Sequence, residues 1–293
     1  MSFDSSFIDG HTVGLPTLSP SLADTAFNAG AAVDHNRFSI IFSERRHLAI
    51  GTAHNIDGNA IIPEGQIERE DRFRFDQSVP NNIQIDNNRG YHDNDWDRGH
   101  LVRRRSLHWG DKAAARDADA KSFFWTNIAP QHMRLHDSAW GKIEDWMLEH
   151  ADDGNKKASV FTGPVLTQSD PIITNKPGEE SFQLPAGFWK IMVVQHRDEL
   201  RAAGFLVWQR DFDRDTPVTF DPILEQVRIT TLEYLTGLSF LDIRNADPLR
   251  FGVTFNSTGP SPASPGRAPR RTIRPGSARN RPAAITTAAD IVL

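Results

Sequence analysis

The sequence predicts an α+β fold in which strands dominate and a few helices lie between them. Short apolar runs bounded by charged or turn residues recur along the chain, which is typical of buried strands. Two further segments place apolar residues at helical spacing behind a capping residue. The chain has 293 residues, of which 38% are hydrophobic and none is cysteine, so it can bury a sizeable core without disulfide bonds.

The apolar runs give the expected strands in chain order. Residues 38–42 and 48–53 flank the charged segment 44–46, which predicts two strands around a turn. A polar stretch from 57 to 97 follows, and a loop of that length in a compact domain is usually functional or disordered. Three later runs are expected to be core strands: 159–162, 188–194 and 204–208.

Two helices are expected from capping patterns. Asp137 or Ser138 is expected to cap a helix, and Thr230 with Glu233 matches a capping box. The apolar residues at helical spacing in the first of these helices are Trp140, Ile143, Met147 and Leu148.

The composition divides the chain into three parts. Residues 1–35 are rich in Ser, Gly and Ala and are expected to form a loosely structured N-terminal arm, followed by one domain over 36–256. Residues 257–293 are rich in Pro, Gly, Ser and Arg. Because the stretch up to residue 282 has one sizeable apolar side chain, it cannot bury enough surface to offset its ordering entropy, and we expect a flexible tail.

The charge distribution limits how the protein could bind a polyanion. The net charge is −5, but the tail holds six arginines and one acid, which leaves 27 basic and 37 acidic residues, a net charge of −10, in the rest of the chain. Contact with nucleic acid must therefore use a local basic patch or the tail. The sequence has no 18-residue apolar run and no signal-peptide pattern, so we expect a cytoplasmic protein without membrane contact, although export by another route stays open.

The segment 95–105 contains the strongest chemical pattern. His100 directly follows a glycine, and four arginines lie within eight residues. An imidazole with a pKa near ~6.5 can accept a proton from water at neutral pH, and a guanidinium matches the geometry of a phosphate. The alternative is a solvated basic loop with an incidental histidine. The four arginines are Arg98, Arg103, Arg104 and Arg105.

A second segment, 123–144, runs from an apolar strand through a polar turn into a helix. It carries Asn127, Gln131, His136 and Glu144. Neutral His or Asn side chains and a carboxylate are all usable around a divalent cation. His132 and His136 could alternatively complete a three-histidine zinc site with His100, but His132 is expected to precede the helix, which weakens that interpretation.

These segments together carry a specific resemblance. Asp97-Arg98-Gly99-His100, then Thr126-Asn127-Ile128-Ala129-Pro130-Gln131, then Trp140 and Glu144, resemble the DNA/RNA non-specific endonuclease family in type and order. This family comprises ββα-metal (His-Me finger) nucleases of the endonuclease G type. The resemblance extends from about residue 38 to about residue 240.

The resemblance implies a fold, an activity and a set of residue roles. The fold would be a mixed, largely antiparallel β core with an inserted ββα-metal motif. The activity would be metal-dependent hydrolysis of phosphodiester bonds in DNA, RNA or both, with little sequence preference. His100 would be the general base, Arg98 would contact a phosphate with Arg103, Arg104 and Arg105 nearby, Asn127 would support the geometry around the histidine, and Glu144 would hold water in the outer shell of the metal.

One position departs from the family pattern. The family's direct metal ligand is an asparagine, and the corresponding position here is His136. One divalent ion, Mg or Mn, is expected, but imidazole is softer than an amide oxygen, so Ni, Co or Zn become candidates. Three alternatives stay open: His136 is the ligand, Asp137 replaces it, or the site has lost its ion.

Two other classes of function remain alternatives. If the ion is lost, the fold could serve as a catalytically silent module that binds nucleic acid or protein. The chain could also be the nuclease effector of a larger assembly. The expected partners are DNA, RNA or both, with a protein partner or inhibitor and a homodimer as further alternatives.

Overall fold

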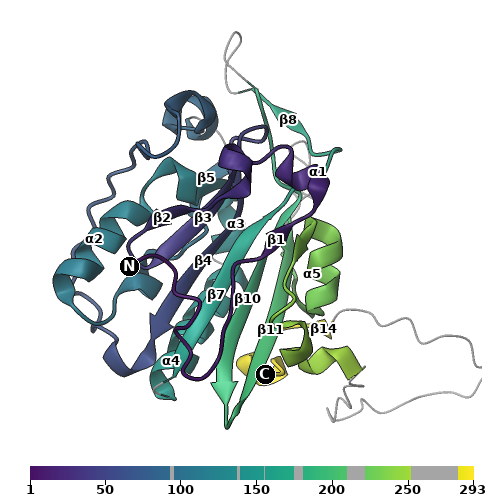
Figure 1. Ribbon diagram of the computed structural model, residues 1–293. Coiled ribbons are helices and arrows are strands. Elements are labelled where there is room, and N and C mark those ends of the chain that lie inside the picture. Colours follow the sequence, from purple (N-terminus) through teal and green to yellow (C-terminus); the bar gives the residue numbers. More distant parts are fainter. Residues whose placement is uncertain (93–95, 137–138, 155, 175–180, 210–221, 252–282) are drawn as a thin grey trace, which may run out of the picture.

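In the computed structural model, one large antiparallel sheet organises the chain (Figure 1). The structure describes residues 1–92, 96–136, 139–154, 156–174, 181–209, 222–251 and 283–293. The strand order of the sheet is β14-β12-β11-β10-β7-β4-β3-β2. Its strands are β2 (Val33–His35), β3 (Phe38–Ser43), β4 (Leu48–Asp57), β7 (Lys157–Val165), β10 (Gly187–His196), β11 (Glu199–Trp208), β12 (Leu224–Val227) and β14 (Ala283–Ala284).

Three two-stranded ribbons and several helices surround this sheet. The α+β prediction is confirmed, and the apolar runs expected to be strands lie in β3, β4, β7, β10 and β11. The ribbons are β1 (Thr17–Leu18) with β13 (Leu238–Ser239), β5 (Trp96–His100) with β6 (Ile128–His132), and β8 (Ile172–Ile173) with β9 (Phe182–Gln183). The α-helices are α1 (Pro20–Ala23), α2 (Lys112–Ser122), α3 (Met133–His136), α4 (Ala139–Asp153) and α5 (Ile229–Thr236).

The sheet has two covered faces, each with its own apolar cluster. On the pocket face, α4 and the β5–β6 ribbon pack through Trp140, Ile143 and Trp96. On the opposite arm face, the N-terminal segment and α5 pack through Ile8 and Leu232. Figure 1 shows the N-terminal segment running along the sheet on the same side as α5. Because strand side chains alternate, each central strand contributes to both clusters.

The N-terminal segment is more ordered than the expected loose arm. Ile8 and Val13 are buried against the arm face, and residues 33–35 join the sheet as β2. The backbone of Phe3 donates a hydrogen bond to Ser39 Oγ, at 3.2 Å. Scattered apolar residues in a Ser- and Gly-rich stretch are therefore sufficient for docking when a preformed sheet supplies the partner surface.

The end of the chain also differs from the expected flexible tail. Residues 283–284 form β14 beside β12, and the side chain of Gln226 exchanges two hydrogen bonds with the backbone of Val292, at 2.7 and 2.9 Å. The rest of the expected tail, 257–282, lies outside the described residues, so its flexibility stays a prediction.

Helix α5, the second of the two helices expected from the sequence, does not use the expected capping box. Its N-cap is Arg228, and the backbone of Ile229 donates to a carboxylate oxygen of Asp247 at 2.9 Å. Glu233 instead accepts from the backbone of Phe240 and pairs with Arg244 at 2.9 Å. A tertiary contact from a later segment thus replaces the local cap. The caps expected for α4, Asp137 and Ser138, lie outside the described residues.

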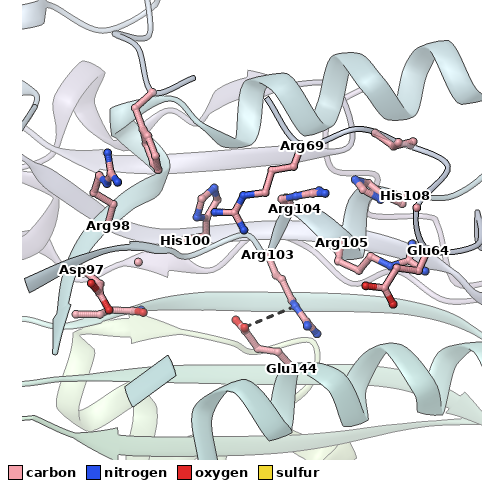
Figure 2. Close-up of a pocket in the computed structure, with 15 residues that line it drawn as sticks. Glu64, Arg69, Asp97, Arg98, His100, Arg103, Arg104, Arg105, His108 and Glu144 are labelled. Atoms are coloured by element: carbon pink, nitrogen blue, oxygen red, sulfur yellow. Dashed lines mark ion pairs between the residues drawn. The ribbon is translucent and has the colours of Figure 1, made fainter. Parts of the chain in front are cut away.

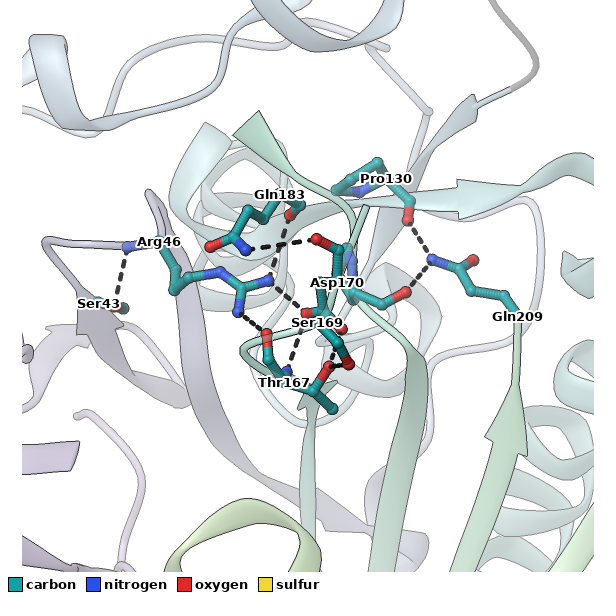
Figure 3. Close-up of polar contacts among 9 residues, drawn as sticks. Ser43, Arg46, Pro130, Thr167, Ser169, Asp170, Gln183 and Gln209 are labelled. Atoms are coloured by element: carbon teal, nitrogen blue, oxygen red, sulfur yellow. Dashed lines mark hydrogen bonds and ion pairs between the residues drawn. The ribbon is translucent and has the colours of Figure 1, made fainter. Parts of the chain in front are cut away.

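A buried polar cluster fixes the turn between β3 and β4 to the segment after β7 (Figure 3). Arg46 donates to the backbone oxygen of Thr167 at 3.0 Å and forms an ion pair with Asp170 at 2.5 Å. The Asp170 side chain is 1% exposed, so the pair is shielded from solvent. None of the helices in the described ranges combines the length and apolar composition that crossing a bilayer needs.

Candidate active site

The ribbon β5–β6 and helix α4 form a ββα unit on the pocket face. The two strands are antiparallel, with His100 opposite Ile128 and Trp96 opposite His132. The intervening chain leaves after His100, forms α2, and returns through a short 3₁₀ turn at Trp125–Asn127. The two segments singled out in the sequence are therefore neighbours in space.

Asn127 clamps the chain immediately after His100. Its side chain is fully buried, and its Oδ1 accepts from the backbone of Val102 at 2.9 Å while its Nδ2 donates to the Val102 carbonyl at 3.0 Å. The Asn127 carbonyl accepts from the backbone of Leu101 at 2.9 Å. These contacts fix where β5 ends. The supporting role toward His100 that the resemblance implies for Asn127 stays a prediction.

Gly99 and Gln131 explain the close packing of the ribbon. A Cβ atom at position 99 would overlap the Gln131 side chain, so only glycine lets that side chain lie across β5. Strand β6 is in turn anchored to the large sheet by Gln209, whose Nε2 donates to the Pro130 and Pro185 carbonyls at 3.2 and 2.9 Å (Figure 3). The position of His100 is thus set by buried side chains that contact the backbone of the ribbon.

Aromatic side chains orient the imidazole of His100. Its ring meets Phe123 edge-on, with centroids 4.9 Å apart, and Phe73 at 5.9 Å. The guanidinium of Arg98 lies over the Phe73 ring, 4.4 Å from its centroid. Phe73 belongs to the long polar stretch 57–97, which is therefore part of the site.

His100 opens onto a pocket of about 510 Å³. Figure 2 shows Arg98 and Asp97 at one end and His108 and Glu64 at the other, with His100 between them. The charged and polar side chains that line it are Glu64, Arg69, Asp97, Arg98, His100, Arg103, Arg104, Arg105, His108, Gln131 and Glu144. Five arginines against three carboxylates make this a local basic patch on an acidic protein.

Glu144 faces the pocket from α4 and is held by two cations. Its Oε1 lies 2.9 Å from the Nζ of Lys190, and its Oε2 lies 3.8 Å from the Nε of Arg103. Lys190 is 2% exposed. Burial lowers the pKa of the Lys190 ammonium below its ordinary value, and the neighbouring Glu144 carboxylate opposes that shift.

The arginines expected to bind substrate all line the pocket, but each of the three in the run also contacts the protein. Arg103 forms an ion pair with Asp145 at 2.5 Å, and Arg104 pairs with Asp119 at 3.2 Å. Arg105 donates to the Ile62 carbonyl at 2.7 Å. Their role toward substrate stays a prediction.

Three pocket or near-pocket residues are not among the site residues that the sequence predicts. Arg69 packs over the Phe123 ring that also contacts His100, with 5.9 Å between its guanidinium carbon and the ring centroid. His108 pairs with Asp119 at 2.5 Å. Lys190 is the third, and its signal was a lone lysine inside an apolar strand run.

The residues expected to bind a metal are only partly described. His136 ends α3, but nothing of its side chain is described, and Asp137 lies outside the described residues. Among the described residues no group of three or more His, Asp or Glu side chains could hold a metal ion. Glu144 and Asp97 nevertheless supply carboxylate oxygens to the pocket, a donor type that fits a hard divalent cation.

The three-histidine alternative does not match the geometry. His132 lies opposite Trp96, at the other end of the β5–β6 ribbon from His100. It is 4% exposed, and its Nδ1 accepts from the backbone of Arg134 at 3.2 Å. His132 is therefore part of the packing of the strand end.

The site thus combines a basic pocket with a histidine on a ββα unit, and sequence comparison assigns the family of the chain. The family described as DNA/RNA non-specific endonuclease matches residues 20–247. The chain belongs to this family.

Individual relatives agree with this assignment. The uncharacterised protein y4fB of Sinorhizobium fredii is 32% identical over 263 residues, which are 80% of this chain and 38% of that protein. A nuclease of Nostoc sp. is 25% identical over 70% of this chain and 71% of its own length. Human mitochondrial endonuclease G is 28% identical over 59% of this chain and 57% of its own length.

A solved structure confirms the fold. A chain in the crystal structure of a complex between EndoG and EndoGI, which describes EndoG inhibition, superposes with a TM-score of 0.54 at 18% identity. The match covers 76% of this chain and 90% of that chain. The large antiparallel sheet with its helices is therefore the endonuclease G fold.

Proposed function

We propose that this protein is a metal-dependent endonuclease that hydrolyses phosphodiester bonds of DNA, RNA or both with little sequence preference. The observation that carries the proposal is the position of His100 in a basic pocket, between Arg98 at one end and Glu144 on the opposite wall. Family membership supports the same reaction class.

His100 acts as the general base. Its ring is wedged against Phe123 and Phe73, so the imidazole is oriented before substrate arrives. It removes a proton from a water molecule, whose oxygen then attacks phosphorus. The bond from phosphorus to the 3′ oxygen breaks, and that oxygen takes up a proton, which leaves 5′-phosphate and 3′-hydroxyl ends.

The arginines bind and orient the phosphate. Arg98 is exposed at the end of the pocket and is held by its contact with Phe73, so its guanidinium can pair with phosphate oxygens near the scissile bond. Contacts to phosphates carry no base information directly, which agrees with little sequence preference.

Glu144, with His136 on the preceding helical turn, would hold the divalent cation on the side of α4. Both oxygens of Glu144 already face cations, so a contact through water suits it better than direct ligation. A bound divalent cation would supply Lewis-acid stabilisation of charge on the phosphoryl oxygens.

The test is cleavage of plasmid DNA and of RNA by wild type, by His100→Ala and by His196→Ala. General base catalysis contributes ~10²–10⁴-fold, so we expect a rate loss of that size in His100→Ala with folding unchanged. His196 is exposed at the end of β10 and does not line the pocket, so its variant should cleave like wild type. A comparable rate in folded His100→Ala would refute this role.

The metal dependence needs a separate measurement. Cleavage should stop with EDTA and return on addition of Mg²⁺, Mn²⁺, Ni²⁺ or Zn²⁺ to different extents. Full activity in EDTA would contradict the metal-dependent mechanism while leaving the family assignment intact.

His108 is the competing base, because it lies in the same pocket. Its Nε2 is committed to Asp119, and the residue is 3% exposed. We therefore expect His108→Ala to lower the free energy of unfolding, while the cleavage rate of the folded protein changes little. If the rate loss exceeded that of His100→Ala, His108 would be the base instead.

A further inference from the structure

Lys190 is a buried cation in the middle of the large sheet. It lies on β10 between Phe188 and Met192 on the pocket face, where both neighbours belong to the apolar cluster. Its side chain is 2% exposed, and it does not line the pocket. An apolar residue at this position would continue the pattern of the strand, so the lysine needs a reason.

The ammonium of Lys190 connects three separate elements. Its Nζ lies 2.9 Å from Glu144 Oε1 on α4, 3.2 Å from the Leu101 carbonyl and 3.1 Å from Thr162 Oγ1 on β7. An ammonium has three donors, so all are used. It also lies 4.7 Å from the centroid of the Trp140 ring on α4. Leu101 directly follows His100, so one group contacts both the helix with the carboxylate and the strand end with the histidine.

Stability alone does not account for this arrangement. Replacing a buried ion pair by apolar residues of similar volume is often neutral or stabilising, whereas removing one partner is strongly destabilising. The side chain of Glu144 opens onto the pocket while Lys190 holds it from behind. The pair is therefore arranged to present one carboxylate, in one orientation, to whatever occupies the pocket.

We propose that Lys190 is a positioning residue of the active site, which fixes the Glu144 carboxylate and the end of the His100 strand relative to each other. The proposal rests on the proposed function, because it assigns Lys190 a purpose in that same site. In this role Lys190 makes no direct contact with substrate. The contact to Leu101 gives the lysine influence on the histidine segment that no apolar residue could have.

The first experiment tests the pair without any activity. Thermal unfolding is measured for wild type, Lys190→Met, Glu144→Gln and the double variant. Each single change leaves a buried polar partner behind, so we expect the midpoint to fall by roughly 6–15 °C, and the double variant to lose clearly less than the sum. Additive losses would show that the two side chains are not coupled and would overturn the proposal.

The second experiment separates positioning from a structural role. Binding of Mn²⁺ is measured by electron paramagnetic resonance on the same four proteins. Lys190→Met should weaken Mn²⁺ by ~10–100-fold, as expected when a residue that orients a ligand is lost, and should cause no further loss in the Glu144→Gln background. Equal affinity in wild type and Lys190→Met would overturn the proposal even if the thermal coupling is found.

Kinetics give the third readout, with Lys142→Met as the matched control. Lys142 is exposed on α4, so this variant loses the same charge without touching the pair. Lys190→Met should lower kcat and leave KM for DNA unchanged, because Lys190 does not line the pocket. A rise in KM with unchanged kcat would make it a substrate-binding residue and refute positioning. If wild type neither binds Mn²⁺ nor cleaves, the proposed function fails, and the positioning role that depends on it fails with it, even if the thermal cycle still shows the pair.

Discussion

The two faces of β10 bury different kinds of side chain, although both are formed by alternate residues of one strand. On the arm face, Trp189, Ile191 and Val193 are all apolar and fully buried. On the pocket face, the row Phe188, Met192 and Val194 is interrupted by Lys190, which reaches across to α4. The arm face buries apolar area only, whereas the pocket face accepts a desolvated charge in order to hold a polar site.

The same contrast continues into the neighbouring strands. Thr162 on β7 is paired with Lys190 in the register, and its hydroxyl is one of the lysine's acceptors. His54 on β4 lies on this face too, and burial, with the nearby Lys190, lowers its pKa to about 3. Polar groups thus concentrate behind the site, where each must be satisfied or kept neutral. The comparison indicates that polar residues buried in the core, beneath the pocket wall, contribute to the proposed function.

The largest effect should come from the arm face and should spare the chemistry. Trp189 is fully buried, contacts Phe240 at 5.6 Å between ring centroids and donates from Nε1 to the Pro164 carbonyl. Trp189→Ala should lower the free energy of unfolding by ~3–5 kcal/mol. Denaturant titration measures this loss, and the rate per folded molecule should stay near that of wild type. A selective loss of rate would break the separation between the faces.

Glu144→Gln, on the pocket face, should impair metal binding in addition to the loss of stability expected from breaking its pair with Lys190. Loss of the carboxylate charge should weaken metal binding by ~10–100-fold, as measured by calorimetry. Arg98→Ala should instead raise KM or lower turnover with metal affinity nearly unchanged. Glu149→Gln on the exposed side of α4 is the control for a charge change in the same helix. The reverse pattern, with Arg98 controlling metal affinity, would exchange the assigned roles.

His136→Asn tests whether the residue at the end of α3 is the metal ligand. A nitrogen donor favours Mn, Co and Ni over Mg, and it must be neutral to bind. Wild type should therefore need less Mn²⁺, Co²⁺ or Ni²⁺ than Mg²⁺, and should lose metal below about pH 6 as the histidine protonates. The variant should shift toward Mg²⁺ and lose that acid sensitivity. If metal titrations are the same for both proteins, Asp137 becomes the better candidate ligand.

The smallest effect concerns His54. Because its folded pKa lies below the unfolded value near ~6.5, the unfolded state binds the extra proton first, and stability rises with pH over this interval. The contribution of neutral, buried His54 to the free energy of unfolding is fully present above about pH 6.5 and is lost as pH falls toward 3. His54→Gln should flatten the decline of unfolding free energy measured between pH 7 and 5, whereas the exposed His196→Gln should not. An unchanged slope would mean that His54 binds its proton as readily in the folded protein as in the unfolded state.

The sequence predicted the β core and the chemical centre of the site. Apolar runs located β3, β4, β7, β10 and β11, because a strand buried on both faces is apolar at nearly every position. The segment with Arg98, Gly99 and His100, and the turn with Asn127, were also visible, since the chemistry of these side chains is local. The resemblance of these segments to one family, in residue type and in order along the chain, indicated that they belong to the same site.

The tertiary structure decided what surrounds that centre. Arg69 and His108 enter the pocket from segments that carry no motif, and the docking of the N-terminal segment required a sheet to dock on. Above all, Lys190 is an isolated anomaly in the sequence, and its meaning depends on Glu144 and Leu101, which are far from it along the chain. Local pattern fixes which residues are apolar or extended, but the partner of a buried charge is set by packing. A desolvated ammonium is stable only where the fold brings acceptors from several elements to one point.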